Sequence, residues 1–370
     1  MAGQRAGGRR LAVLCLALLA AGSLLFAATL GSGGRHGAAN AGPRRSSASA
    51  GAGGSCAAGL LLVPPCGVWW GAYVPEGGNG LAASVGDLEQ RIGRRLDIVY
   101  TYHDMSTGQD GQLLTPDEQA LGRSHLLMLS WASVVWQGGP GGSGRQLAWR
   151  DIAAGRYDTT VIDPQIKRIK AYGAPVLLSF DEEMDSLVGP GRTPADYVAA
   201  YRHLWQRCHD LGADNVVWVW TITGYLGSDA LFPALYPGDS YVGWIAFDPY
   251  NYFDCHRIST WSDFEQTVRP GYAWLRAHVS ATRPMMLAEY GTAVDPAHPA
   301  AQRTWFEQIP AALRTMPGIK AVVQWDSSVP GPDCDLSLDN PEALGGFRAA
   351  GRDPMFQQHV PSVSPRAVSG

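Results

Sequence analysis

The feature that most constrains the fold is an alternation of short apolar runs with amphipathic stretches, which begins at Cys66. Eight of the runs are rich in β-branched and aromatic residues, as buried strands are. Two of the intervening stretches begin with a capping residue followed by proline, at Asp163-Pro164 and at Thr193-Pro194, which predicts helix starts. The eight predicted strands cover residues 67–74, 96–102, 125–131, 175–180, 215–221, 242–248, 284–290 and 320–326.

Such alternation predicts an α/β chain built around a parallel sheet. Eight strand–helix units over about 300 residues fit a (β/α)8 TIM barrel better than a doubly wound open sheet. The open sheet is further disfavoured because no run is followed by a glycine-rich turn with dinucleotide-binding spacing. We therefore expect a single catalytic domain over residues 59–360, followed by a C-terminal tail at 361–370.

The N-terminal region has the sequence pattern of an export signal. Residues 1–30 have a basic start and an apolar run from Leu11 to Leu30, typical of a secretion signal or an uncleaved signal anchor. Residues 31–58 are rich in Gly, Ala and Ser, which predicts a flexible linker. We expect an exported protein, extracellular or at the cell surface, with a membrane tether through residues 11–30 if the leader is retained.

The charge of the chain excludes one class of partner. Residues 1–58 hold six arginines and no Lys, Asp or Glu, so the chain's formal net charge of −4 becomes −10 without them. An acidic body with no basic run argues against nucleic acid as a partner. No His pair with ligand spacing follows a predicted strand, which argues against a catalytic metal. We expect no cofactor and a monomeric chain.

Five cysteines follow the one in the leader. In an exported protein, five cysteines suggest two disulfides and one thiol. Cys208 lies on the apolar stripe of a predicted helix, so we expect it to be the buried thiol. The expected pairs are Cys56 with Cys66 and Cys255 with Cys334.

Carboxylates and aromatic rings dominate the ends of the predicted strands, where the active site of a (β/α)8 barrel lies. Glycosidases cleave with a pair of carboxyl groups, and aromatic faces stack on sugar rings. These residue types therefore point to a carbohydrate substrate. The strand ends carry Tyr73, Tyr102, His103, Asp104, Trp131, the acidic cluster 181–185, Trp220, Asp248, Tyr250, Asn251, Glu289, Tyr290, Trp325 and Asp326.

Glu289 is the sharpest signal, because a lone carboxylate at the end of an apolar strand is costly to bury. A salt bridge to a neighbouring arginine is the structural alternative. On the fourth predicted strand, alternation places Asp181 and Glu183 on one side and Glu182 on the other. The partner of Glu289 is then Asp181 or Glu183, and spacing alone leaves both open.

Three tryptophans at strand ends, Trp131, Trp220 and Trp325, are candidates for contact with sugar rings, and most of the other tryptophans are expected in the core. His103 follows the second strand and has two readings. It could bind a sugar hydroxyl near Glu289, or it could be a hydrogen-bonded structural histidine.

Several motifs together resemble glycoside hydrolase family 26, the β-mannanase and β-glucanase family of the retaining (β/α)8 clan. The most specific block is "YPGDSYVGWIAFDPYNY" at 236–252, with "EEMD" upstream and "LAEYG" downstream. The runs "WGAYVP", "VVWVWTIT" and "VVQWDSS" are similar to the family's first, fifth and eighth strands. The resemblance covers residues 66–340.

The resemblance implies roles for three residues. Glu183 matches the acid/base, Glu289 matches the nucleophile, and Tyr250 matches the tyrosine that holds the nucleophile. The chain also departs from the family pattern around the acid/base. Glu182 and Asp185 replace a His and an Asn, and Ser179 stands where an Arg is usual.

The implied activity is that of an exported endo-β-glycosidase, which hydrolyses mannan or a mixed-linkage β-glucan by double displacement with retention. The departures beside Glu183 motivate an alternative function. In that reading the chain is a catalytically silent barrel that binds extracellular polysaccharide.

Overall fold

The computed structural model describes residues 59–108, 111–136, 144–256, 260–328, 335–357 and 360. All of them belong to one compact unit. The predicted leader, linker and tail, at 1–30, 31–58 and 361–370, lie outside the described residues, so these boundaries stay predictions. No helix in the described part of the chain is long and apolar enough to cross a membrane.

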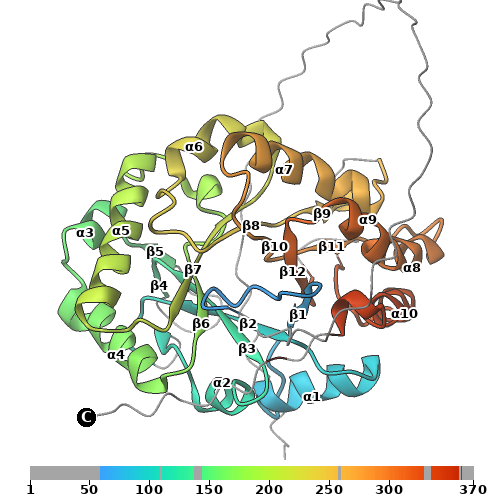
Figure 1. Cartoon of the computed structure of the whole chain (residues 1–370), viewed down its shortest axis with the longest axis horizontal. Helices are drawn as coiled ribbons and strands as arrows, with labels where there is room; N and C mark the ends of the chain where they lie inside the picture. The colour runs from blue at the N-terminus through green and yellow to red at the C-terminus, as the bar shows by residue number, and fades with distance from the viewer. Residues whose placement is uncertain are drawn as a thin grey trace, which may run out of the picture. The chain divides into compact units, whose positions relative to one another are not determined.

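Eight parallel strands close into a barrel, which confirms the predicted fold class (Figure 1). The strands follow one another around the barrel in chain order, and β1 closes it by pairing with both β2 and β12. Each strand coincides with one of the eight apolar runs. The barrel strands are β1 (Trp69–Tyr73), β2 (Ile98–Asp104), β3 (Leu126–Ala132), β6 (Val176–Phe180), β7 (Val216–Ile222), β8 (Trp244–Phe247), β10 (Met285–Leu287) and β12 (Ile319–Trp325).

Helices surround the barrel and cover the outer face of its strands (Figure 1). The longest are α5 (Pro194–Asp210), α7 (Phe264–His278) and α1 (Leu81–Ile92). The others are α2 (Pro116–Leu121), α3 (Trp149–Ala153), α4 (Asp163–Tyr172), α6 (Phe232–Leu235), α8 (Ala300–Glu307), α9 (Ile309–Thr315) and α10 (Pro341–Ala350).

Alternation along the strands separates two apolar layers, because successive side chains point to opposite faces. Inside the barrel, a small core includes Trp69, Tyr100, Met128 and Trp244. Between strands and helices, a larger core takes up the neighbouring positions, such as Val99. The barrel interior is therefore filled by side chains, and the space for a substrate is at the strand ends.

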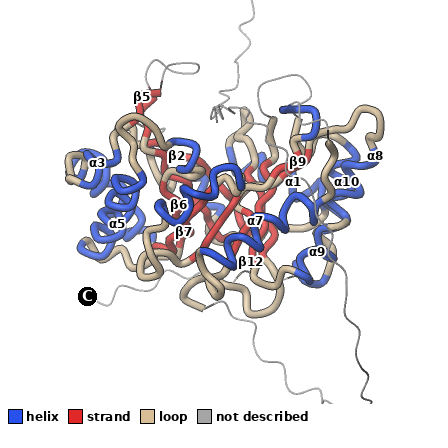
Figure 2. The backbone as a smooth tube through the Cα atoms, turned by 90° about the horizontal axis from the view of Figure 1, so that it is seen from above, coloured by secondary structure: helices blue, strands red, loops and turns tan. Residues whose placement is uncertain are grey.

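Two small sheets extend the carboxyl ends of the strands. Directly after β3, strands β4 (Val134–Trp136) and β5 (Gly144–Gln146) form an antiparallel hairpin that projects beyond the barrel (Figure 2). After β8 and β10, strands β9 (Tyr250–Asn251) and β11 (Gly291–Thr292) pair in parallel. This second pair keeps the segments around Tyr250 and Glu289 side by side.

The helix starts follow the sequence only in part. Thr193 caps α5 as predicted, since its Oγ1 accepts a hydrogen bond from the Asp196 backbone N–H at 3.1 Å. Asp163 is not a cap. A π-helical turn over Asp158–Ile162 runs directly into α4, so Asp163 is already helical.

Three of the cysteines lie in the described part of the chain. Cys208 is a buried free thiol on α5, as expected. Cys66 and Cys255 are both disulfide-bonded. Their predicted partners, Cys56 and Cys334, lie outside the described residues, so the pairing stays a prediction.

Candidate active site

Glu289 lies two residues beyond the end of β10, at the mouth of the barrel. Its two carboxylate oxygens accept hydrogen bonds from two tyrosines on different strands. Tyr102 Oη donates to Oε1 at 2.5 Å, and Tyr250 Oη donates to Oε2 at 2.6 Å. Within the described residues, the side-chain hydrogen bonds of this carboxylate come from the two tyrosines and no arginine pairs with it, so the salt-bridge alternative is not supported.

Burial raises the pKa of Glu289, and the hydrogen bonds from Tyr102 and Tyr250 oppose that rise. Burial, and then the negative charge of Glu289, holds the pKa of both tyrosines well above the ordinary value. Both hydroxyls therefore keep their protons and act as donors. A carboxylate held by two donors has a fixed orientation and is stabilised in its charged form, as a nucleophile requires.

Asp248 supports Glu289 from below. It directly follows β8, is buried, and accepts a hydrogen bond from the Glu289 backbone N–H at 2.9 Å. Its other oxygen, Oδ2, has no hydrogen-bond partner among the residues that the structure describes. Burial, followed by the charges of Glu289 and Glu183, raises the pKa of Asp248 well above its usual range. Glu183 and Glu289 therefore share this buried carboxyl as a common neighbour.

Aromatic rings form one wall of the mouth around Glu289. Tyr73 stacks on Trp325 with 6.1 Å between ring centroids and meets Tyr102 edge-on at 4.9 Å. Tyr250 meets Trp325 edge-on at 6.4 Å. All four rings are half-buried, so each keeps some surface for a ligand. Trp325 thus lies at the mouth, and its contact with a sugar ring stays a prediction.

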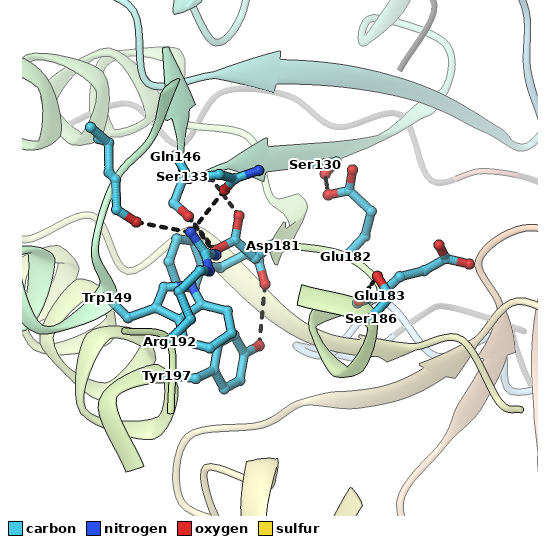
Figure 3. A network of polar contacts seen from close by, with 12 residues as sticks. Ser130, Ser133, Gln146, Trp149, Asp181, Glu182, Glu183, Ser186, Arg192 and Tyr197 are labelled. Carbon is cyan, nitrogen blue, oxygen red and sulfur yellow. Dashed lines mark hydrogen bonds and ion pairs between the residues drawn. The ribbon is translucent and has the colours of Figure 1, made fainter. Parts of the chain in front are cut away.

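Strand alternation breaks at the acidic cluster after β6. Asp181 has a φ of 45° and Glu183 a φ of 56°, both in the left-handed region that non-glycine residues rarely adopt. Asp181 consequently turns away from the mouth into a buried network around Trp149 and Arg192, while Glu182 and Glu183 lie on its other side (Figure 3). Of the two acids that spacing left open, Asp181 is therefore excluded as the partner of Glu289.

Glu183 follows the turn and is half-buried. Its backbone N–H donates to the Thr221 carbonyl at 3.0 Å, and its carbonyl accepts from Ser186. The next carboxylate, Asp185, accepts hydrogen bonds from Thr223 N–H at 2.9 Å and Thr223 Oγ1 at 2.5 Å. Asp185 thus connects the loop after β6 to the loop after β7.

Glu182 enters the mouth, contrary to the predicted alternation. It is hydrogen-bonded to Ser130 Oγ on the inner face of β3 (Figure 3). Burial, followed by the charge of Glu289, raises the pKa of Glu182 well above its ordinary value. The mouth therefore holds an additional carboxyl, and burial favours the neutral form of this group.

Two predicted sugar contacts are wrong. Trp131 and Trp220 are both fully buried in the outer core, between strands and helices. Each indole donates to a backbone carbonyl, that of Asp104 at 3.1 Å and that of Leu235 at 3.1 Å. Their strand positions alternate with inward-facing residues, so their rings point away from the mouth.

His103 also points away from the mouth, and the substrate-binding reading of this residue is not supported. Its Nε2 is 2.7 Å from Glu118 Oε1 on α2 and 3.2 Å from Thr101 Oγ1. The three side chains are buried behind β2. His103 is thus the hydrogen-bonded structural histidine of the alternative reading.

The sequence pattern places Tyr73 and Tyr102 at strand ends but does not mark either of them as a site residue. Both pack against the inner core. Tyr102 lies two residues after the inward-facing Tyr100, so the period of two along β2 is the signal that places it in the mouth. Its pairing with Glu289, 187 residues away, follows only from closure of the barrel.

Known proteins share both sequence and fold with this chain. Residues 148–282 match the model of Glycosyl hydrolase family 26. Endoglucanase H of Acetivibrio thermocellus is 26% identical over 321 residues, which make up 82% of this chain and 33% of that protein. These matches support membership of glycoside hydrolase family 26.

Solved structures of family 26 share the fold. A ruminal endo-β-1,4-mannanase superposes with a TM-score of 0.56 at 15% identity, over 80% of this chain and 65% of that chain. The family 26 domain of an endo-β-mannanase/endo-β-glucanase from Prevotella bryantii superposes with a TM-score of 0.55 at 15% identity, over 80% of this chain and 92% of that chain.

The segment that matches the family model includes Glu183 and Tyr250 and ends before Glu289. The place of Glu289 in the site therefore rests on the geometry described above. The chain also spans only about a third of the length of Endoglucanase H.

Proposed function

We propose that the chain is a retaining endo-β-glycosidase that hydrolyses mannan or a mixed-linkage β-glucan by double displacement. One observation carries the proposal: the Glu289 carboxylate is held between Tyr102 Oη and Tyr250 Oη at the barrel mouth. The substrate class is supported by the family 26 relatives, which are an endoglucanase and endo-β-mannanases.

In the proposed reaction, Glu289 attacks the anomeric carbon while Glu183 protonates the departing glycosidic oxygen. A covalent glycosyl–enzyme ester forms and the leaving chain departs with the proton. Glu183, now ionised, takes a proton from water, whose oxygen attacks the anomeric carbon and releases Glu289. Tyr250 and Tyr102 hold the nucleophile, and Trp325 with Tyr73 offers aromatic surface for a sugar ring.

The test compares the full chain with Glu289→Ala on mannan, mixed-linkage β-glucan and xylan, with reducing ends as the readout. We expect release from mannan or β-glucan and a loss of about 10³-fold or more in kcat/KM for the variant, because covalent catalysis needs the carboxylate. NMR of the first product should show the β anomer.

Glu265→Ala is the matched control, since Glu265 is an exposed residue of α7 that pairs with Arg269. Its activity should equal that of the wild type. Release that survives Glu289→Ala would refute the assignment of the nucleophile.

One observation favours the alternative of a silent polysaccharide-binding barrel. Glu182 adds a further carboxyl to the mouth, and its pKa is raised partly by the charge of Glu289. If the wild type releases nothing yet is retarded by one of these polysaccharides in native gels, the chain binds without cleaving.

We also propose that the protein is exported, with residues 1–30 as a cleaved signal or a membrane tether. The disulfide-bonded state of Cys66 and Cys255 supports an oxidising compartment. Cell fractionation and the N-terminal sequence of the mature protein test this. Intact residues 1–30 in the membrane fraction indicate a tether, and soluble cytoplasmic protein contradicts export.

A further inference from the structure

The turn that carries the proposed acid/base begins at Asp181, whose backbone conformation is unfavourable. With a φ of 45°, Asp181 lies in the left-handed region, which is unfavourable for a residue with a Cβ atom. Such a conformation persists only where surrounding contacts impose it. The contacts that do so lie on the side of Asp181 away from the barrel mouth.

Four donors surround the Asp181 carboxylate. Ser133 N–H donates to Oδ1 at 2.5 Å. Oδ2 accepts from Ser133 Oγ at 2.5 Å, Trp149 Nε1 at 2.5 Å and Arg192 Nη2 at 3.0 Å. The residue is only 2% exposed, so a carboxylate here depends on these donors for its charge.

Arg192 is held as tightly as its partner. Its guanidinium lies over the Trp149 ring, 4.0 Å from the centroid. Nη1 donates to Gln146 Oε1 at 2.8 Å and to the Leu147 carbonyl at 2.9 Å, and Nη2 also donates to Ser133 Oγ at 3.0 Å. The Arg192 guanidinium is planar, and its hydrogen bonds together with the Trp149 ring beneath it fix its orientation.

The Asp181–Arg192 pair therefore joins the end of β6 to the β4–β5 hairpin, to α3 and to the loop before α5 (Figure 3). Without the contacts of this pair, the alternation of β6 would continue and the Asp181 side chain would point into the mouth. With them, the Asp181 side chain points outward and the next two residues enter the mouth. The pair thus decides which acidic side chains of the turn face the mouth.

We propose that Asp181 and Arg192 are positioning residues, which hold the turn so that Glu183 presents its carboxyl to the glycosidic oxygen. The inference rests on the proposed function. Neither residue reaches the substrate. Asp181→Asn keeps the shape of the side chain but replaces an acceptor by an amide that faces donors, and it leaves the buried Arg192 charge without its partner.

Leaving-group dependence separates positioning of an acid from general damage. A 2,4-dinitrophenyl β-glycoside departs without protonation, whereas a phenyl β-glycoside needs the acid. The full chain and Asp181→Asn are compared on both aryl glycosides of the oligosaccharide that the wild type accepts. We expect kcat/KM to fall about 10²-fold for the phenyl glycoside and less than about fivefold for the dinitrophenyl glycoside.

A second signature appears in the individual constants. Because Glu183 also activates water, the variant should accumulate the glycosyl–enzyme intermediate on the dinitrophenyl glycoside. Its kcat and KM should then fall together. Added azide, which needs no base, should raise kcat by attacking the intermediate. A purely structural role would produce none of these changes.

Asp163→Asn is the matched control, since it removes another Asp–Arg pair, with Arg207 at 2.7 Å, which lies on the helical side of the barrel. It should alter thermal stability at most. Ser133→Ala, a milder change that removes one donor to Asp181, should shift the leaving-group ratio in the same direction by a smaller factor. It also serves if Asp181→Asn does not fold.

The outcomes are distinct. If Asp181→Asn lowers kcat/KM by the same factor for both leaving groups, or for neither, the positioning role is wrong and the proposed function stands. If the wild type hydrolyses neither aryl glycoside nor polysaccharide, the proposed function fails and the positioning role fails with it.

Discussion

At the residue scale, the state of Glu289 is decided by the balance of burial against two tyrosine hydroxyls. Burial disfavours the carboxylate, and each hydroxyl favours it. Tyr102 lies on β2, and Tyr250 lies on β9, just after β8. Since β2 and β8 are on different sides of β10 in the barrel order, the meeting of the two donors depends on closure. Removal of one donor should therefore change the protonation of the nucleophile without a large change in the fold.

Tyr102→Phe should reduce kcat/KM about 10- to 100-fold, which corresponds to the loss of one charge-assisted hydrogen bond. The sign of the pH effect follows from the same contact. Because the donor lowers the pKa of Glu289, its loss raises that pKa further and moves the acid limb of the kcat/KM profile to higher pH.

The pH profiles of the wild type, Tyr102→Phe and the exposed control Tyr225→Phe check this prediction. Tyr225 is 57% exposed on the loop after β7. An acid limb that stays in place in Tyr102→Phe would contradict the role of the hydroxyl.

At the element scale, buried polar contacts fasten helices to strands behind the site. His103 on β2 and Glu118 on α2 illustrate this, since their side chains are 2.7 Å apart and both are buried. Glu118 also closes the capping box of α2 with Thr115. The histidine thus contributes to the docking of α2 and not to the mouth.

His103→Ala should lower the free energy of unfolding by about 1–3 kcal/mol, because it leaves a buried carboxyl with one partner fewer. The kcat/KM of the remaining folded protein should be unchanged. Urea unfolding and activity assays measure the two quantities. His298→Ala is the control, because His298 pairs with Asp295 through a side chain that is 78% exposed. A selective loss of kcat/KM in His103→Ala would restore its substrate-binding role.

At the scale of the whole molecule, the fold buries carboxyl groups whose hydrogen bonds and nearby positive charges do not offset the cost of burial. Burial raises the pKa of Asp97 and of Asp326 to about 6. A group whose folded pKa lies above its unfolded value stabilises the fold fully below the unfolded pKa, and this contribution is lost as pH rises through the folded pKa. Both groups therefore make the folded barrel less stable at pH 7 than at pH 5.

We expect each of the two groups to contribute about 1 kcal/mol to the fall in unfolding free energy between pH 5 and pH 7. Chemical unfolding at both pH values measures it. Asp326→Asn should remove its share of the fall, because an amide does not titrate. Asp239→Asn, which alters an acidic residue with a 67% exposed side chain, should leave the fall unchanged. A pH dependence identical in the wild type and Asp326→Asn would contradict the account.

Local pattern determined most of the architecture. The eight strands were predictable because buried parallel strands are short apolar runs, and Thr193 was predictable as a cap because its hydrogen bond is local. Glu289 could be proposed as a site residue because a carboxyl at the end of such a run is costly to bury.

Only the tertiary structure decided which side chains meet. The positive φ at Asp181 reversed the alternation of β6 and brought Glu182 into the mouth, and its cause lies in Ser133, Trp149 and Arg192, which are distant in sequence. Barrel closure placed Tyr102 beside Glu289 and turned Trp131 into the outer core. The contacts that define the site join residues that are 11 to 187 positions apart in the sequence. Tertiary packing brings such residues together, and local residue spacing cannot predict it.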